Sequence, residues 1–277
     1  MTRFLSEEQV AGYQRDGFVF PLRAFARETA DAYRHRLESY EAGTGAPIHS
    51  NMRHKVHLLF TWASELIRHP RILDAVEDVL GPDILCWSTN FFIKEAGDES
   101  FVSWHQDSTY WGLEPPDVVT AWVALSDAPV ESGAMKFIPG SHLGGQIAHK
   151  DTFDPKNLLT RGQQIEGNLD LSEAVSVPLQ AGEFSLHHIR LAHGSEPNLT
   201  ANRRIGFAIR YIGAHVKPVK SARSATLVRG IDQFGHFDLE QAPVLDLDTN
   251  ALAAHAQAMK GQLAALYSDT GVETARD

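Results

Sequence analysis

Apolar residues recur every three or four positions in the first third of the chain and again near its end, which is the spacing of helices. The sequence predicts helices over about 6–16, 25–40, 70–80 and 250–267. Ser6 and Gln9 have the spacing of a capping box at the start of the first helix. Pro70 and Gly81 are placed to begin and end the third. A loop is expected over 41–51, which contains two glycines and a proline.

The pattern changes at residue 84, where short β-rich runs separated by Gly, Pro and Asp begin. Strands are predicted at 18–20, 84–94, 118–125, 135–138, 184–187 and 205–212. Short strands with turns between them predict a sandwich or barrel. A less regular stretch, 143–180, interrupts them and is expected to form a lid or outer loop.

One α+β domain with a mainly β core is therefore expected over residues 1–277. It divides into a helical part over about 1–83, a β core over about 84–213 and a C-terminal segment with a helix over 214–277.

Composition and charge narrow the class of protein. Apolar residues make up 43% and charged residues 22% of the 277, an ordinary globular mixture. The formal net charge of −10 argues against nucleic acid or an anionic membrane as partner, so a small molecule is expected. No leader and no run of about twenty apolar residues is found, so a cytoplasmic location is expected. The single cysteine, Cys86, lies in an apolar run and is expected to be a buried, inert thiol.

Fourteen histidines are more than a core or a surface requires, and one of them stands two residues before an aspartate. On a strand, His105 and Asp107 point to the same face and offer two adjacent metal ligands. Two nitrogens and one carboxylate with open positions are the ligand set of non-haem iron(II) oxygenases, so a third ligand is expected on another strand. The alternative is a pair at a strand end that is bonded only to its neighbours.

A second group of candidate residues follows the run at 184–187. His193 and Ser195 are followed by Arg204, eleven residues after the histidine, and by another strand. A histidine ending one strand and an arginine starting the next can lie side by side in an antiparallel pair. The guanidinium is suited to hold a carboxylate in a bidentate fork. A surface ion pair is the alternative for Arg204.

Taken in order, these pieces resemble the phytanoyl-CoA dioxygenase family of Fe(II)/2-oxoglutarate oxygenases. The matching segments are 92–94, 104–107, 121–127, 132–135, 138–142, 193–195 and 203–211, with a similar opening over 5–20. The resemblance implies a double-stranded β-helix, a cupin-like jelly roll with flanking N- and C-terminal helices. It implies Fe(II), 2-oxoglutarate and O2 as cofactors.

The resemblance also implies roles for particular residues. The iron ligands would be His105, Asp107 and His193, and the far carboxylate of 2-oxoglutarate would be held by Arg204 and Ser195. Thr120, Trp122 and Lys94 would border the cofactor or the substrate, although Lys94 equally fits a solvated strand edge and Trp122 a packing role with one face in the pocket. Because halogenating relatives lack the carboxylate, the presence of Asp107 favours hydroxylation.

Four other histidines compete for the third ligand position: His142, His149, His187 and His188. His193 is preferred because only it is followed by Gly-Ser and then by Arg204 at the family's spacing. His142 belongs to a Pro-Gly-Ser-His turn, where a structural role is expected.

Two stretches are candidates for binding the substrate. Tyr110 and Trp111 either wall the pocket or are ordinary core aromatics. The basic stretch 51–57 either binds an anionic substrate group, through Arg53, His54, Lys55 or His57, or is a solvated helix start or loop.

The expected activity is hydroxylation of an aliphatic C–H bond of a small polar metabolite, with release of succinate and CO2. An aminophosphonate, an amino acid and a quaternary amine fit these features. The alternatives are a natural-product or acyl substrate, including desaturation or epimerisation, and a non-catalytic cupin-like binding module. The oligomeric state is not predicted.

Overall fold

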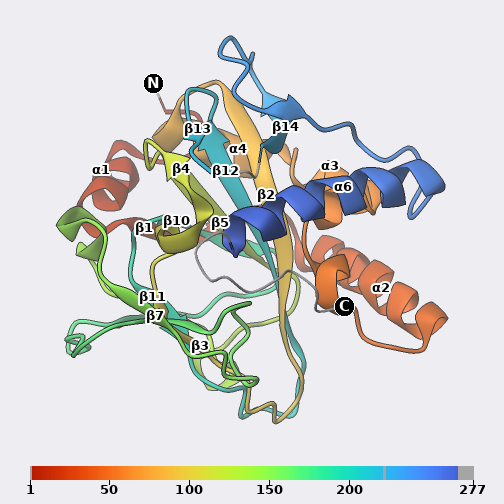
Figure 1. The fold of residues 1–277 in the computed structure, drawn as a ribbon. Coiled ribbons are helices and arrows are strands. Elements are labelled where there is room, and N and C mark those ends of the chain that lie inside the picture. The colour runs from red at the N-terminus through yellow and green to blue at the C-terminus, as the bar shows by residue number, and fades with distance from the viewer. Residues whose placement is uncertain (1, 221–222, 268–277) are drawn as a thin grey trace.

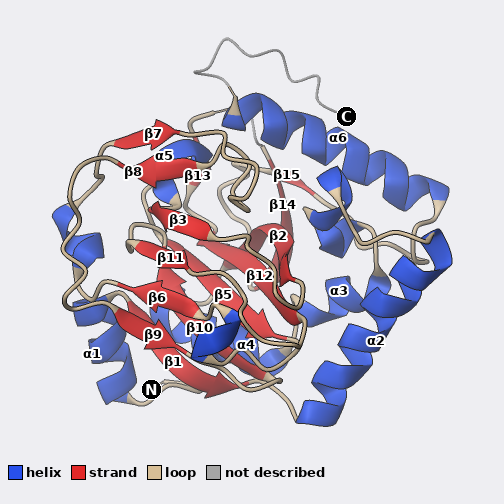
Figure 2. Ribbon diagram, turned by 90° about the horizontal axis from the view of Figure 1, so that it is seen from below, coloured by secondary structure: helices blue, strands red, loops and turns tan. Residues whose placement is uncertain are grey.

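Two facing β-sheets with helices on their outside make up the described part of the chain. The computed structural model describes residues 2–220 and 223–267. Seven strands form the larger sheet in the order β1-β10-β5-β12-β2-β14-β15, and four form the smaller one in the order β3-β11-β6-β9. The sheets and the helices around them are visible in Figures 1 and 2. The predicted mainly β core with flanking helices is confirmed.

The larger sheet consists of β1 (Phe18–Arg23), β10 (Glu183–His188), β5 (Val118–Ala124), β12 (Arg204–Gly213), β2 (Ile84–Lys94), β14 (Ser224–Arg229) and β15 (Asp238–Leu239). The smaller sheet consists of β3 (Val102–His105), β11 (His193–Ser195), β6 (Met135–Phe137) and β9 (Val175–Val177). Two further strand pairs are β4 (Leu113–Glu114) with β13 (Lys217–Pro218) and β7 (His149–Asp151) with β8 (Gln163–Ile165). The α-helices are α1 (Glu7–Asp16), α2 (Arg27–Thr44), α3 (Thr61–Leu66), α4 (Pro70–Leu80), α5 (Ser108–Trp111) and α6 (Thr249–Leu266). Short 3-10 turns cover Ser50–Arg53, Val56–Leu58, Val130–Ser132 and Ser141–Gly144.

The two faces of strand β12 have different surroundings. It pairs with β2 and β5 along most of its length, so neither of its edges is free. Side chains alternate between the two faces of a strand. One face carries four apolar side chains that join the core formed with α2, α3 and α4: Ile205, Phe207, Ile209 and Tyr211. The other face, which points between the two sheets, carries Arg204, Gly206, Ala208 and Arg210.

Most predicted elements are present with small shifts. Helix α1 has both capping-box hydrogen bonds, and α4 begins at Pro70. The prediction of a loop over 41–51 is wrong for its first part, because α2 continues to Thr44 and ends at Gly45, whose φ of 71° suits glycine. Strand β14 was not predicted. It adds residues from beyond 213 to the larger sheet.

The irregular stretch 143–180 contains short strands rather than a bare loop. Strand β9 pairs with β6 in the smaller sheet, while β7 and β8 pair with each other. These strands are three residues long, which is too short for a visible alternation of polar and apolar residues.

A buried ion cluster ties the C-terminal part of the chain to the segment before α3. Lys55 Nζ donates to Glu240 Oε1, and His57 Nε2 lies 3.1 Å from Glu240 Oε2. Lys55 Nζ also donates to the backbone oxygens of Trp87 on β2 and Ser224 on β14. Burial raises the pKa of Glu240, but the adjacent Lys55 and His57 outweigh it and hold that pKa below its usual range.

The reading of Lys55 and His57 as solvated is therefore wrong, because each is 1% exposed and contacts Glu240. Neither residue lines the outer cavity described below, so the structure gives no support to a role in substrate binding. The charged partner lies 185 residues away from Lys55, so no local pattern indicates it.

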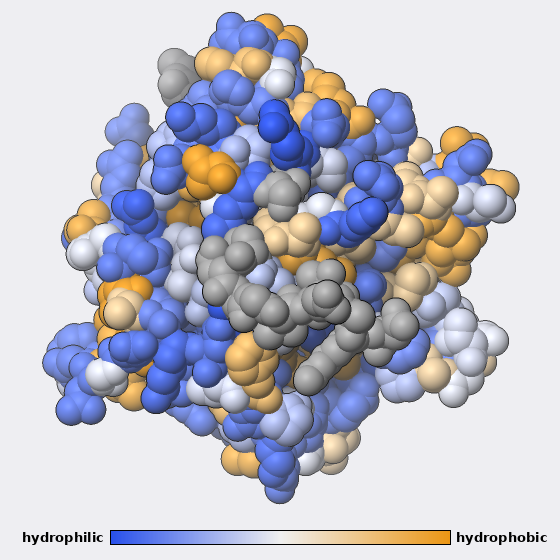
Figure 3. Space-filling view, viewed as in Figure 1, coloured by the Kyte–Doolittle hydropathy of each residue, from blue (hydrophilic) through white to orange (hydrophobic). Residues whose placement is uncertain are grey.

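Exposed apolar side chains occur at several separate places on the described surface. Figure 3 shows a mainly hydrophilic side on which hydrophobic residues are interspersed. The most exposed large ones, Val244, Leu199 and Leu143, come from different parts of the chain. Among the described helices, none has the length and apolarity needed to cross a membrane.

Replacing Glu240 by glutamine should test the ion cluster. The free energy of unfolding should fall by about 3–5 kcal/mol, because the ammonium of Lys55 stays buried without its partner. The folded pKa of Glu240 lies below its unfolded value, so its contribution is complete above a pH of about 4.3 and is lost as the pH falls through the folded pKa. The deficit, measured by denaturant unfolding, should therefore be constant near neutral pH and shrink in acid.

The matched control is Glu99→Gln, which removes the carboxylate of the exposed Lys156–Glu99 pair. It should leave the unfolding midpoint unchanged, since exposed ion pairs contribute little. Equal midpoints for Glu240→Gln and the parent protein would show that the buried cluster adds nothing to stability.

Candidate metal centre

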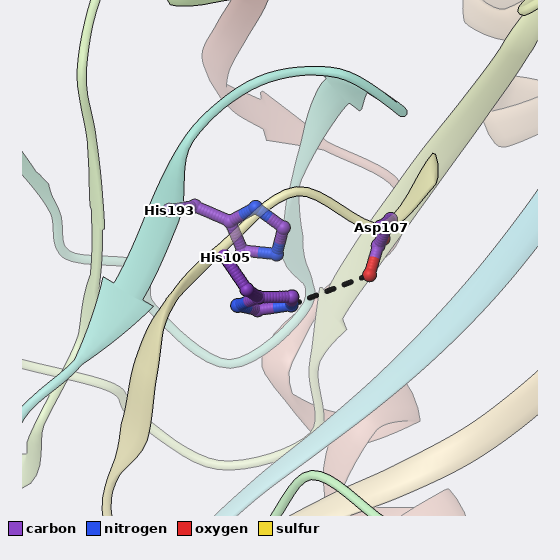
Figure 4. A group of neighbouring side chains, drawn as sticks. All are labelled: His105, Asp107 and His193. Atoms are coloured by element: carbon purple, nitrogen blue, oxygen red, sulfur yellow. Dashed lines mark ion pairs between the residues drawn. The ribbon is translucent and has the colours of Figure 1, made fainter. Parts of the chain in front are cut away.

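Three buried side chains with metal-binding atoms converge between the two sheets. His105 ends β3 and His193 begins β11, and the two residues lie opposite each other where these strands pair. Asp107 joins them, with its Oδ1 3.3 Å from His105 Nε2 (Figure 4). One ligand atom from each residue lies within 4.8 Å of the others. The three residues predicted to form the site are brought together.

The route by which Asp107 reaches the site differs from the expectation. The prediction that His105 and Asp107 share a strand face is wrong, because β3 ends at His105 and Asp107 has helical dihedral angles (φ −60°, ψ −32°) at the start of α5. The turn nevertheless places the Asp107 carboxylate next to the His105 imidazole. Thr120 on β5 donates its hydroxyl hydrogen to Asp107 Oδ2 at 3.4 Å.

Both imidazoles are oriented by the backbone. Nδ1 of His105 donates to the carbonyl oxygen of Ser103 at 2.9 Å, and Nδ1 of His193 donates to that of Leu191 at 2.9 Å. Carbonyl oxygens only accept, so Nδ1 carries the hydrogen and Nε2 keeps its lone pair. Burial, reinforced by His105, lowers the pKa of His193 to about 4, so its imidazole is neutral at pH 7.

This arrangement fits a divalent cation. Two Nε2 lone pairs and a carboxylate face one another, and acceptors that converge without a hydrogen between them repel unless a cation lies among them. Burial raises the pKa of Asp107, but the neighbouring imidazoles and Arg210 outweigh it and hold that pKa below its usual range. Two imidazoles and one carboxylate without a thiolate suit Fe(II). Cys86 is elsewhere, fully buried and with its pKa raised by burial, as predicted.

His187 is the nearest competitor for the third position. Its Nε2 lies 4.0 Å from Asp107 Oδ2 and its ring centroid 4.8 Å from that of His193. It comes from β10 in the larger sheet, whereas His105 and His193 share the smaller one. Its Nδ1 has no hydrogen-bond partner among the described residues, so the backbone does not orient its ring as it does the other two.

The remaining competitors have other contacts. His149 accepts from the backbone N–H of Gln106 at 2.9 Å. His142 contacts the carbonyl oxygen of Gln14 and packs against His188 with ring centroids 5.2 Å apart. The structural role predicted for His142 is consistent with these contacts.

An inner pocket beside the three ligands contains the predicted cationic residues. Arg204 is 1% exposed and Lys94, opposite it on β2, is 0% exposed. Lys94 Nζ donates to Ser195 Oγ at 2.8 Å, and the guanidinium of Arg204 lies 5.4 Å from the Trp122 ring and donates to the Gly133 carbonyl. The surface-ion-pair reading of Arg204 and the solvated-edge reading of Lys94 are both wrong. Burial lowers the pKa of Arg204 to about 10, and burial together with Arg204 lowers that of Lys94 to about 6.

The strands that carry His193 and Arg204 are not paired, contrary to the prediction. Strand β11 belongs to the smaller sheet and β12 to the larger one, so the two residues face each other across the interior. Two glycines make room there. A Cβ on Gly206 would lie 1.9 Å from the Trp122 ring, and one on Gly133 (φ 70°) would lie 2.0 Å from the Glu196 carbonyl oxygen.

An outer cavity of about 800 Å³ adjoins the site at Asp107, the one residue of the three that lines it. Predicted residues Tyr110, Trp111 and Arg53 line it, together with His54, whereas His57 does not. Asp107, Phe92 and Arg210 line both the inner pocket and the outer cavity, so the two meet at these residues.

Sequence reasoning missed Arg210. Its position six residues after Arg204 on a predicted strand was the available signal, because even spacing places both on one face. It also missed the glutamine between the ligands. Gln106 Nε2 donates to the backbone oxygens of Gly145 and Arg190 and so holds the loops beside the ligands together.

Comparisons with known proteins give a consistent picture. The family model "Phytanoyl-CoA dioxygenase (PhyH)" matches residues 13–206. The structure resembles the apo form of the non-heme monooxygenase ThoJ, with a TM-score of 0.84, 37% identity, and coverage of 94% of this chain and 98% of that one. The predicted cupin-like fold is thereby confirmed, with an open sandwich rather than a closed barrel.

Curated relatives are more distant. A probable alpha-ketoglutarate-dependent hypophosphite dioxygenase of Stutzerimonas stutzeri is 30% identical over 59% of this chain, and the match spans only 57% of that protein. An L-proline trans-4-hydroxylase of Streptomyces griseoviridis is 24% identical over 72% of this chain and 77% of its own length.

Separate substitutions of the two histidines should distinguish the third ligand. His193→Ala should weaken Fe(II) binding at least about tenfold, since it removes one of three donor atoms, and His187→Ala should change it by less. Anaerobic titration calorimetry with Fe(II) measures both. Equal losses, or a larger loss for His187→Ala, would move the third ligand to His187.

Proposed function

The chain belongs to the phytanoyl-CoA dioxygenase family, and on this basis we propose that it is an Fe(II)- and 2-oxoglutarate-dependent oxygenase that hydroxylates an aliphatic C–H bond of a small polar metabolite. The observation that carries the proposal is the buried set of His105, Asp107 and His193, with donor atoms that face one another. These residues would hold Fe(II). When bound, the metal with 2-oxoglutarate and O2 supplies the oxidising power, and 2-oxoglutarate leaves as succinate and CO2.

The inner pocket is suited to the far carboxylate of 2-oxoglutarate. Arg204 and Lys94 are buried there, and neither has a carboxylate partner in the described chain. A guanidinium that keeps a planar fork can hold a carboxylate with two parallel hydrogen bonds. Ser195 lies within hydrogen-bond distance of Lys94 and adds a hydroxyl to the same region. A dicarboxylate would therefore supply the negative charge that this pocket lacks.

Trp122 and Thr120 would act by position. The Trp122 ring lies close to both Gly206 and the Arg204 guanidinium, so it would give the pocket a flat apolar wall that excludes water. Thr120 keeps one oxygen of Asp107 bonded, which orients the carboxylate toward the imidazoles. Exclusion of water from the pocket strengthens the electrostatic interactions inside it.

The outer cavity would receive the primary substrate. Trp111 packs on Trp87 with ring centroids 5.1 Å apart, and the Tyr110 hydroxyl donates to Asp151 at 2.7 Å, so these aromatic walls are fixed in place. The hypophosphite and proline enzymes act, by their names, on small polar molecules. Because these relatives act on small polar molecules, we propose an amino acid or an aminophosphonate as the substrate of this chain.

A larger natural-product scaffold is the second candidate. The volume of about 800 Å³ lies in the upper part of the range for small-molecule sites, which is roughly 300–1,000 Å³, and exceeds what a single amino acid fills. A non-catalytic binding module is disfavoured, since the three donor residues and Arg204 are all retained.

The activity is tested by substrate-dependent release of succinate. The purified protein, Fe(II) and 2-oxoglutarate should produce succinate above the uncoupled background with at least one member of a panel of amino acids, aminophosphonates, quaternary amines and natural products. Anaerobic addition of Fe(II) and 2-oxoglutarate should first give a visible charge-transfer band. Absence of both the band and the succinate would favour the binding module.

The role of Arg204 is tested by the number of carboxylates on the ligand. Arg204→Gln should weaken 2-oxoglutarate binding at least about tenfold, the loss expected when a hydrogen bond between charged groups is removed. 2-Oxobutanoate keeps the keto acid and lacks the far carboxylate, so it should bind the parent protein and the variant equally. Calorimetry with both ligands checks this, and an equal loss for the two would place Arg204 away from the far carboxylate.

A further inference from the structure

Arg210 is a buried cation that has no ion pair among the described residues, and the carboxylate whose charge acts on it is the proposed metal ligand Asp107. It follows Arg204 by six residues on the same face of β12, and its side chain is 7% exposed. Its guanidinium has no ion pair and no hydrogen-bond acceptor among the described residues, and its Nε is fully buried without a partner. Buried charges are ordinarily paired, because leaving water without compensation is costly. A bound ligand that carries negative charge would explain why Arg210 is buried at this position.

Two aromatic rings hold the guanidinium in place. It lies 5.3 Å from the Trp111 ring centroid and 5.7 Å from that of Phe92. Contacts of this kind offset part of the desolvation. They use none of the five N–H donors of the guanidinium, which stay available for hydrogen bonds because no described residue accepts from them.

The charges already in the site leave Arg210 without a counterion. On the proposed function, Asp107 and a 2-oxoglutarate dianion together balance Fe(II) and Arg204; Lys94 adds no charge at pH 7, because burial and Arg204 lower its pKa to about 6. Arg210 adds one further positive charge beside them, where it lines both cavities. Asp107 is also the sole acidic side chain among the described residues that line the outer cavity. The missing negative charge must then arrive with the remaining ligand.

We propose that Arg210 binds an anionic group of the primary substrate, a carboxylate, phosphonate or phosphate, and that the substrate is therefore an organic anion. The cosubstrate is a less suitable source of this group. Six residues of strand separate the Cα atoms of the two arginines by about 20 Å, and the inner cations already match the far carboxylate. Arg53, which donates to the Leu158 carbonyl at 3.2 Å, makes the outer part of the same cavity positive as well. This inference rests on the proposed function for its charge balance.

The test uses simple probes in place of the substrate. Methylphosphonate and propionate are titrated into the protein saturated anaerobically with Fe(II) and 2-oxoglutarate, and propionamide serves as the neutral isostere of propionate. The parent protein should bind both anions and show a higher melting temperature with them, whereas propionamide should do neither. Arg210→Gln should lose at least about tenfold in anion affinity, and its 2-oxoglutarate affinity should change by less than about threefold.

Further variants separate binding from folding. Arg210→Gln should melt no lower than the parent protein without ligands, because it removes an uncompensated buried charge. Arg210→Lys keeps the charge and loses the planar fork, so it should retain part of the anion affinity. Arg53→Gln, at the outer part of the cavity, should weaken anion binding less than Arg210→Gln.

Three results would overturn the proposal. Unchanged anion affinity in Arg210→Gln would remove Arg210 from an anion site. A loss of 2-oxoglutarate affinity as large as that of Arg204→Gln would assign Arg210 to the cosubstrate. Preference for propionamide over propionate would exclude an anionic substrate. Failure of the proposed function is distinguishable, because anion binding is also measured in metal-free Arg204→Gln protein, where neither Fe(II) nor the inner pocket contributes.

Discussion

The interior of the sandwich contains positive charges that have no carboxylate partner, and the rest of the structure has to be stable enough to keep them buried. Arg204 and Arg210 lie between the sheets, where Asp107 is the single carboxylate among the described residues that line the inner pocket. Each unpaired buried charge costs several kcal/mol. The surrounding framework is extensively paired and packed: β12 is hydrogen-bonded on both sides, and its opposite face is buried against three helices. The strand that bears the two guanidiniums is thus also the strand that anchors the core, and a slip of one residue would bring both guanidiniums into the apolar side.

The pairing of β12 with β2 is interrupted where the outer cavity begins. Arg210 lies opposite Ser88 and Tyr211 opposite Cys86, so Trp87 is an extra residue on β2. A bulge of this kind lets two consecutive side chains face the same way. Both Trp87 and Ser88 line the outer cavity, and Trp87 stacks on Trp111, which in turn contacts Arg210. The irregularity therefore builds the wall that holds the unpaired guanidinium.

The sequence was informative where residues with suitable chemistry also occur in a recognisable order along the chain. His105, Asp107, His193 and Arg204 were identified because their motifs occur in a fixed order, although their positions in the sheets were not. The spacing predicted that one strand ends near His193 and another begins near Arg204. Which sheet each strand joins depends on packing between distant segments, so the sequence did not show it. The basic stretch shows the same limit: Arg53 and Lys55 look alike in sequence, yet one lines the cavity and the other meets a glutamate 185 residues away.

The paired cations show that the unpaired ones are not a failure of packing. Lys55 meets Glu240, and Arg161 forms an ion pair with Asp151 while its guanidinium lies 3.9 Å from the Tyr110 ring. In both cases the chain supplies a carboxylate partner, and neither cation lines the inner pocket or the outer cavity. Arg204 and Arg210 differ in that both line a cavity. Arg204 and Arg210, which lack carboxylate partners among the described residues, are therefore places for negative charge that bound molecules would supply, at a cost in stability.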